Sequence, residues 1–131
     1  MNDIIVPDLP SSLPKEWSLY DVGFEKGEFI VRLHSDFDAD ECWIVRFCCR
    51  IYGYQVFDEG ERLRTWDVLR DALECPQCAN IYLLRKSCFL DWFHRETYGI
   101  YENQKPQHYF IISSGLCVDV LASEGPEIGR L

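Results

Sequence analysis

The chain has 131 residues, of which 47% are hydrophobic and 27% are charged. This length suits a single domain over residues 1–131, and an aromatic fraction of 15% provides enough apolar surface to exclude a largely disordered chain. Twenty-two acidic residues against thirteen Lys and Arg give a net charge of −9. That charge disfavours nucleic acids and anionic membranes as partners and favours a basic protein.

The sequence also indicates where the protein is located and whether its cysteines are oxidised. No stretch reaches the roughly 20 apolar residues of a membrane span, and the N-terminal residues lack the basic and apolar regions of a signal peptide. We therefore expect a cytoplasmic protein. The seven cysteines are odd in number, which argues against an evenly paired disulfide framework and predicts mostly free thiols.

The first half of the chain predicts strands. Residues 1–15 contain three prolines and indicate an irregular lead-in. Alternating patterns from Trp17 and over residues 29–34 predict a hairpin that turns at Gly27. Residues 42–57 then alternate most clearly and predict one long strand, central over residues 42–52, with a bulge or bend at Gly53 before its continuation. Its buried face is expected to carry Trp43, Val45, Phe47 and Ile51.

The second half predicts two helices and a second hairpin. Thr65 has the side chain of an N-cap for a first helix that Pro76 limits. Residues 81–84 indicate a short strand before a second helix capped by Ser87, although a single helix over residues 79–98 fits the same apolar spacing. Residues 109–121 predict a hairpin that turns at 113–115.

This order of elements predicts an α+β fold. We expect a mostly antiparallel sheet of five to six strands, with the two helices inserted before the C-terminal hairpin.

Two motifs suggest metal binding and fall short of it. Cys75 and Cys78 have the C-x-x-C spacing of a zinc knuckle, but no second cysteine pair completes a structural site. Residues 36–41 resemble the start of a calcium loop, but Glu41 and Phe47 occupy positions that require glycine and a bidentate glutamate. No metal or cofactor is therefore predicted, with zinc on the cysteine pair as the alternative.

Catalytic motifs are also weak. Cys117, His108 and Asp119 of the final hairpin are groups that nucleophilic catalysis uses, but no G-x-S-x-G, H-E-x-x-H or phosphate-binding glycine loop accompanies them. We interpret His108 as a capping or interface residue. The chain is predicted not to be an enzyme, with a thiol enzyme or hydrolase as a second alternative.

Several segments of the C-terminal half resemble small bacterial proteins encoded beside polymorphic secreted toxins. These are the immunity proteins of contact-dependent and type VI secretion systems. The resembling segments are residues 87–94, 98–100, 108–112, 118–121 and 126–128. The resemblance implies a cytoplasmic protein that neutralises a cognate toxin by tight, non-catalytic binding. A small zinc-containing adaptor that uses Cys75 and Cys78 is the alternative.

The binding surface of such a protein is expected where aromatic side chains lie beside acids, since aromatics supply desolvated contact area and carboxylates steer a basic partner. Two acidic turns flank the predicted long strand, which carries two tyrosines. A C-terminal patch around Glu102 and Glu124 is equally open, as is the choice between monomer and homodimer. The predicted partner-binding residues are Asp36, Asp38, Asp40, Glu41, Tyr52, Tyr54, Asp58, Glu59 and Glu61.

Overall fold

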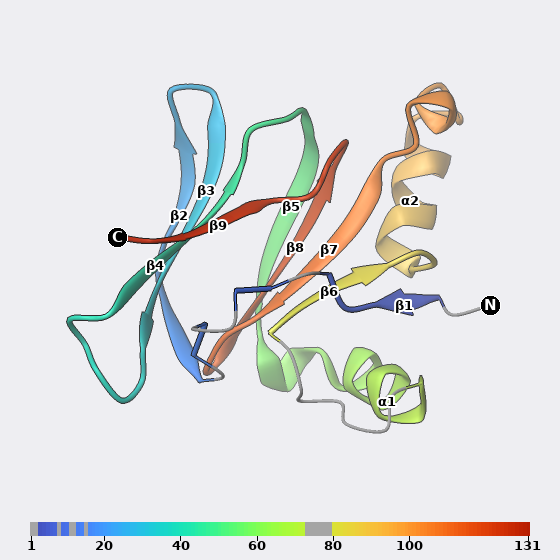
Figure 1. Cartoon of the computed structure of the whole chain (residues 1–131). Coiled ribbons are helices and arrows are strands. Elements are labelled where there is room, and N and C mark those ends of the chain that lie inside the picture. Colours follow the sequence, from blue (N-terminus) through green and yellow to red (C-terminus); the bar gives the residue numbers. More distant parts are fainter. Residues whose placement is uncertain (1–2, 8, 11–12, 15, 73–79) are drawn as a thin grey trace.

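The computed structural model describes residues 3–7, 9–10, 13–14, 16–72 and 80–131 (Figure 1). Within them lie two antiparallel sheets and two helices, which confirms the predicted α+β class. The strands are β1 (Ile4–Ile5), β2 (Trp17–Glu25), β3 (Glu28–Ser35), β4 (Cys42–Phe47), β5 (Ile51–Asp58), β6 (Ile81–Leu84), β7 (Gln107–Ile112), β8 (Leu116–Ala122) and β9 (Glu127–Arg130). The helices are α1 (Leu63–Ala72) and α2 (Cys88–Glu96). One 3₁₀ turn precedes α1 at Glu59–Glu61 and another follows α2 at Glu102–Gln104.

The elements form three layers. A four-stranded sheet, in the order β2-β3-β4-β9, faces a five-stranded sheet, in the order β1-β6-β7-β8-β5. The two helices lie on the other side of the five-stranded sheet (Figure 1). The core between the sheets includes Val31 and Phe47 from one sheet and Ile111 and Val120 from the other. A second, smaller core places Leu69 of α1 against the outer face of the five-stranded sheet.

The long strand predicted over residues 42–57 is wrong as a single element. It is two strands, β4 and β5, which belong to different sheets. β4 is internal, as predicted, and Trp43, Val45 and Phe47 are buried on it. β5 is an edge strand, and Ile51 is only partly buried against the same core. The alternation persists across the break because both strands line one core from opposite sides.

Two short strands were not predicted. β1 lies in the expected irregular lead-in and pairs with β6, where Ile4 lies opposite Leu84. β9 follows the last predicted hairpin and pairs with β4, where Ile128 lies opposite Val45. β1 has only two residues, which is too short for an alternating pattern, and β9 has no large apolar residue besides Ile128.

The helices confirm one predicted cap and correct the other. Ser87 caps α2, since its Oγ accepts a hydrogen bond from the Leu90 N–H at 3.1 Å, and residues 81–84 form a strand instead of the start of a longer helix. Thr65 does not cap α1, which begins earlier, at Leu63. Pro76 lies outside the described residues. Among the helices that the structure describes, none is long and apolar enough to cross a membrane.

Replacing Phe47 with alanine should lower the free energy of unfolding by about 3–5 kcal/mol, the usual cost of emptying a buried aromatic site. Phe47 is fully buried, and its ring centroid lies 6.1 Å from that of Phe29 and 5.7 Å from that of Tyr109. Urea unfolding measures the change. The matched control is Phe37→Ala at an 83% exposed position, which should stay within about 0.5 kcal/mol of the wild type. Equal losses in the two variants would contradict the assigned core.

Candidate functional site

The turn between β3 and β4, residues 36–41, makes hydrogen bonds within itself and to Ser35. We call it the acidic turn. The Phe37 N–H donates to Ser35 Oγ at 3.2 Å, and the Asp40 N–H donates to Asp38 Oδ1 at 3.0 Å. The ends of the turn are closed by the Ser35 N–H, which donates to the Glu41 carbonyl at 2.9 Å. A turn that is already hydrogen-bonded loses little conformational entropy when a partner binds.

Asp36 ties the acidic turn to the rest of the fold. Its carboxylate accepts hydrogen bonds from the hydroxyls of Ser114 and Ser18. These two hydroxyls stabilise the ionised form and hold the pKa of Asp36 below its ordinary value. Asp36 is therefore charged throughout the physiological pH range.

Phe37 projects from the middle of this turn into solvent. Its side chain is 83% exposed, between the exposed carboxylates of Asp36 and Asp38. A large apolar side chain on a polar, well-ordered turn is a feature of protein-binding surfaces, where aromatic anchors supply most of the affinity. Sequence reasoning identified the acids of this turn and missed the phenylalanine among them.

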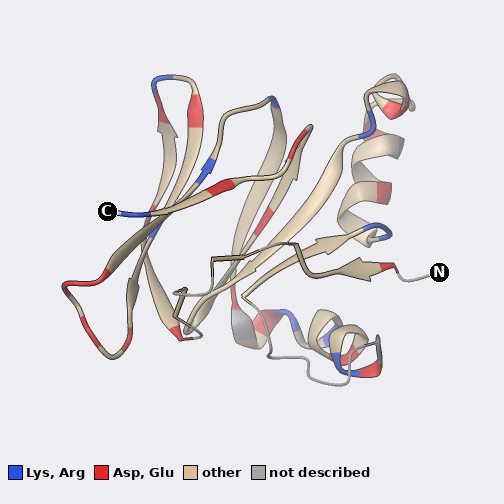
Figure 2. Cartoon of the chain, in the orientation of Figure 1, with Lys and Arg blue, Asp and Glu red and all other residues tan. Residues whose placement is uncertain are grey.

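The second group of acids lies at the same end of the molecule (Figure 2). Asp58, the last residue of β5, lies opposite Leu116 in the sheet. Leu116 follows directly on the turn that contains Ser114, whose hydroxyl binds Asp36. Asp58 and Glu61 are exposed there, while the side chain of Glu59 lies outside the described part of the chain. The two acidic groups therefore flank one hairpin turn.

The predicted tyrosines lie elsewhere. Tyr52 is six residues from Asp58 along β5, a separation of about 20 Å, and its hydroxyl donates to Gln104 Oε1 at 2.7 Å. Tyr54 packs against the rings of Phe29 and Phe24, with centroid distances of 4.6 and 6.0 Å. The structure thus separates both tyrosines from the acidic end.

The alternative acidic patch is not at that end either. Glu102 begins the 3₁₀ turn that holds Gln104, the partner of Tyr52. Glu124 follows β8, and its carbonyl accepts a hydrogen bond from the Cys49 thiol at 3.4 Å. Both acids are exposed. The hydrogen bonds of Glu124 with Cys49 and of Gln104 with Tyr52 place these two turns near the start of β5.

The cysteines offer no metal site in the part of the chain that can be described. Cys75 and Cys78 lie outside the described residues. Within the described ranges, no group of three or more His, Cys, Asp or Glu side chains could hold a metal ion. The Cys48 thiol donates to Glu28 at 2.7 Å. This hydrogen bond, local desolvation and the charges of Glu127 and Glu28 raise the pKa of Cys48 to about 11, which disfavours a reactive thiolate.

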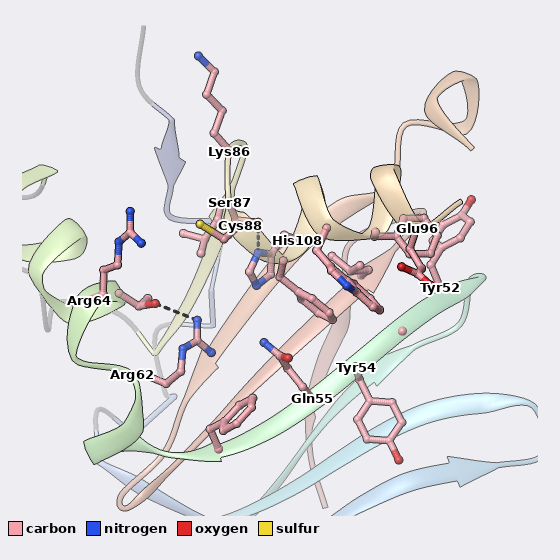
Figure 3. A pocket seen from close by; sticks show the side chains of 18 of the residues that line it. Tyr52, Tyr54, Gln55, Arg62, Arg64, Lys86, Ser87, Cys88, Glu96 and His108 are labelled. Carbon is pink, nitrogen blue, oxygen red and sulfur yellow. Dashed lines mark hydrogen bonds between the residues drawn. The ribbon is translucent and has the colours of Figure 1, made fainter. Parts of the chain in front are cut away.

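A buried ionic network lies under the helices, and we call it the Asp119 network. Asp119 is 0% exposed, and its carboxylate binds His108 Nε2 at 2.6 Å and the guanidinium of Arg62. His108 Nδ1 lies 2.7 Å from Ser87 Oγ, and Arg62 donates to Thr65 Oγ1 at 2.9 Å. The network therefore joins β7 and β8 to the start of both helices. It forms the floor of a cavity of about 990 Å³ (Figure 3).

Charge and hydrogen bonding keep Asp119 ionised. Burial alone would raise the pKa of this carboxyl group. The hydrogen bonds from His108 and Arg62, together with their charges, outweigh burial and hold the pKa of Asp119 below its ordinary value. An ionised carboxylate in this position requires both partners, because an unpaired buried charge is strongly destabilising.

The serine, histidine and aspartate of the network stand in the order of a nucleophilic triad, yet each has a structural partner. The Ser87 hydroxyl also accepts the capping hydrogen bond from the Leu90 N–H. Asp119 shares its carboxylate with Arg62 in addition to His108. Sequence reasoning placed His108 and Asp119 together in one hairpin but paired them with Cys117; Ser87 and Arg62 were missed because they come from distant segments.

Comparison of the chain with protein-family models, with curated proteins and with solved structures finds no match in any of the three.

Replacing Asp119 with asparagine should lower the free energy of unfolding at pH 7 by about 3 kcal/mol, because Arg62 loses its buried counter-charge. The folded-state pKa of Asp119 lies below the unfolded value of about 4, so its stabilising contribution is complete above pH 4. That contribution is lost as the pH falls through the folded-state pKa, and the gap between variant and wild type should narrow there.

Chemical denaturation across this pH range measures the effect. Asp91→Asn is the matched control, because Asp91 is an exposed carboxylate on α2. A variant Asp119→Asn as stable as the wild type at pH 7 would show that the buried charge is dispensable.

Proposed function

We propose that this chain is a binding protein of the immunity type, which neutralises a basic toxin domain by tight, non-catalytic association through the acidic turn. The single observation that carries the proposal is Phe37, 83% exposed within an acidic, hydrogen-bonded turn. The net charge of −9 supports a basic partner. The proposal places the protein in the cytoplasm, where it would protect the cell that makes it.

The acidic turn defines what the partner must present. The partner must offer an apolar hollow for Phe37, because burial of an exposed aromatic side chain supplies most of the binding energy of such a contact. The exposed carboxylates of Asp38 and Asp40 require lysine or arginine side chains at the rim of that hollow. A toxin whose basic active site binds an anionic substrate has this combination of features, and covering the site would inhibit it.

Non-catalytic action fits the way the polar residues are used. The hydroxyl, imidazole and carboxylate of the Asp119 network are bound to one another and to Arg62. Neutralisation by occupancy needs none of these groups to react. It needs a rigid surface, and the hydrogen bonds of the acidic turn supply one.

The direct test is to express the C-terminal toxin domain of the neighbouring gene with and without this protein. Cells should survive only when the protein is present. Phe37→Ala should weaken the complex by about 30-fold, the loss typical of an aromatic hot spot, and should reduce survival.

Tyr98→Ala is the matched control, because Tyr98 is a 94% exposed aromatic residue in the turn that follows α2. This variant should protect like the wild type. Protection that persists in Phe37→Ala, a neighbouring domain that is not toxic, or turnover of a substrate by the purified protein alone would each overturn the proposal.

Association should slow as salt rises, because the Debye length falls from about 10 Å at 0.1 M to about 3 Å at 1 M ionic strength. Dissociation should change less, since buried contacts control it. Stopped-flow mixing with the purified toxin domain separates the two rates. Replacing both Asp38 and Asp40 with asparagine should lower the association rate, while Asp91→Asn with Glu96→Gln on α2 removes the same charge and should not.

A further inference from the structure

The cavity above the Asp119 network is separate from the acidic turn. It opens between α1, β5 and α2, on the outer face of the five-stranded sheet (Figure 3). Its volume of about 990 Å³ is that of a small-molecule binding site. The acidic turn belongs to the other sheet, so a ligand here and a protein partner there would occupy different surfaces.

Aromatic rings form much of the cavity wall. Phe89 and Trp92 of α2 stack with their centroids 6.2 Å apart and their planes inclined by 17°. Trp92 is 49% exposed, and Phe57 on β5 is 39% exposed. Gly53 keeps the space beside them open, since a Cβ added there would meet nothing closer than the Phe89 ring at 4.0 Å. Exposed ring faces in a concave site favour a planar ligand, which gains free energy by displacing water and by stacking.

The charged residues of the lining do not select an ion. Arg62 and His108 are both bound to Asp119 at the floor. The charged ends of Arg64 and Lys86 point away from the cavity (Figure 3). The lining holds two further cations and two acids, which are Arg64, Lys86, Glu61 and Glu96. An ion that entered would lose its hydration and meet no surplus of opposite charge, so the cavity favours an uncharged ligand.

Gln55 places a polar group in this aromatic cavity. Its side chain extends from β5 into the cavity (Figure 3). Gln55 lies opposite Asp119 in the pairing of β5 with β8, and its Nε2 donates to Asp119 Oδ2 at 3.3 Å. An ionised carboxylate can only accept hydrogen bonds, so the amide nitrogen must face Asp119. The buried acid thereby fixes the orientation of the Gln55 amide.

Two hydrogen-bonding groups of this amide are available to a ligand. Among the described residues, neither Oε1 nor the second N–H of Gln55 makes another hydrogen bond. The oxygen can accept from a ligand while the N–H donates to it, which is how a glutamine side chain reads the edge of a ring that carries a donor beside an acceptor. Because Asp119 already orders the side chain, binding costs little of its conformational entropy.

We propose that this cavity binds an uncharged, planar cyclic amide. The ring would lie against Phe89 and Trp92, and its N–H and carbonyl would meet the Oε1 and the second N–H of Gln55. The aromatic wall selects a flat ligand, the balanced charges select a neutral one, and Gln55 selects an edge with a donor beside an acceptor. This binding activity goes beyond the proposed toxin neutralisation and does not depend on it.

The probe for this site is carbostyril, an uncharged cyclic amide of two fused rings, with equilibrium dialysis as the measurement. The folded protein should bind one molecule per chain. N-methylcarbostyril, which keeps the rings and the carbonyl but lacks the N–H, should bind about tenfold more weakly, the loss expected for one hydrogen bond. Equal affinity for the two compounds would overturn the role of Gln55, and failure to bind carbostyril would overturn the site.

A carboxylated carbostyril and its methyl ester test the preference for a neutral ligand. The two compounds have nearly the same size and the same amide edge. The ester should bind more tightly by at least about tenfold, because the carboxylate loses hydration without gaining a counter-charge. A carboxylate that binds as tightly as its ester would contradict an uncharged site.

Gln55→Met removes the amide and nearly keeps the length of the side chain. Asp119 retains Arg62 and His108, so the variant should stay folded. Its affinity for carbostyril should fall to that for N-methylcarbostyril, whose own affinity should not change. Gln107→Met is the matched control, because Gln107 binds the Tyr109 hydroxyl outside the cavity lining. A tenfold preference that persisted in Gln55→Met would overturn the proposal.

Gly53→Val fills the cavity beside the Phe89 ring and should abolish the binding of both compounds. Gly23→Val is the matched control on β2, where a new Cβ meets no atom within 4 Å, and it should bind like the wild type. Circular dichroism checks that each variant is folded. Wild-type affinity in a folded Gly53→Val variant would overturn the site, and Gln55→Met provides the decisive result if Gly53→Val does not fold.

Discussion

The carboxylate of Asp119 is a negative charge with no access to water, and it can stay ionised only if protein groups replace its hydration. Arg62 and His108 provide that replacement, and each of them is held in turn by a hydroxyl group, Thr65 and Ser87 respectively. The start of α1, the start of α2 and strands β7 and β8 are thereby joined by one set of hydrogen bonds. The outer layer of the molecule depends on this one charge.

The same network shapes the surface above it. Because Arg62 and Ser87 hold the beginnings of the two helices over the sheet, the helices do not close over β5, and an aromatic cavity remains between them. Gly53 contributes to that opening, since it has no side chain on the strand face that lines the cavity. The Asp119 network therefore both pairs the buried charges and forms the floor of the cavity.

The acidic turn has a different origin. It exists because the chain leaves β3, makes a tight turn and returns as β4, and because Ser114 from the other sheet holds Asp36 in place. That contact crosses between the two sheets and connects the turn to the β7–β8 hairpin. The result is an acidic surface that carries the exposed Phe37, on a part of the molecule that the helices do not cover (Figure 1).

Local patterns in the sequence determined the features that depend on near neighbours. The capping serine at position 87 and the turn at 113–115 were predicted correctly, because a helix start and a tight turn are decided within a few residues. The net charge also follows from composition alone.

Tertiary structure decided the rest. Alternation over residues 42–57 reports which side chains are buried, but not that the chain changes sheets at residues 48–50 while it continues to line one core. The salt bridge between Arg62 and Asp119 joins positions 57 residues apart, and no local periodicity encodes such a pair. The sequence places Phe37 in an acidic turn, but only the three-dimensional structure shows that its side chain is left in solvent. Burial and ion pairing are properties of the assembled layers, so they were fixed when the sheets and helices packed together.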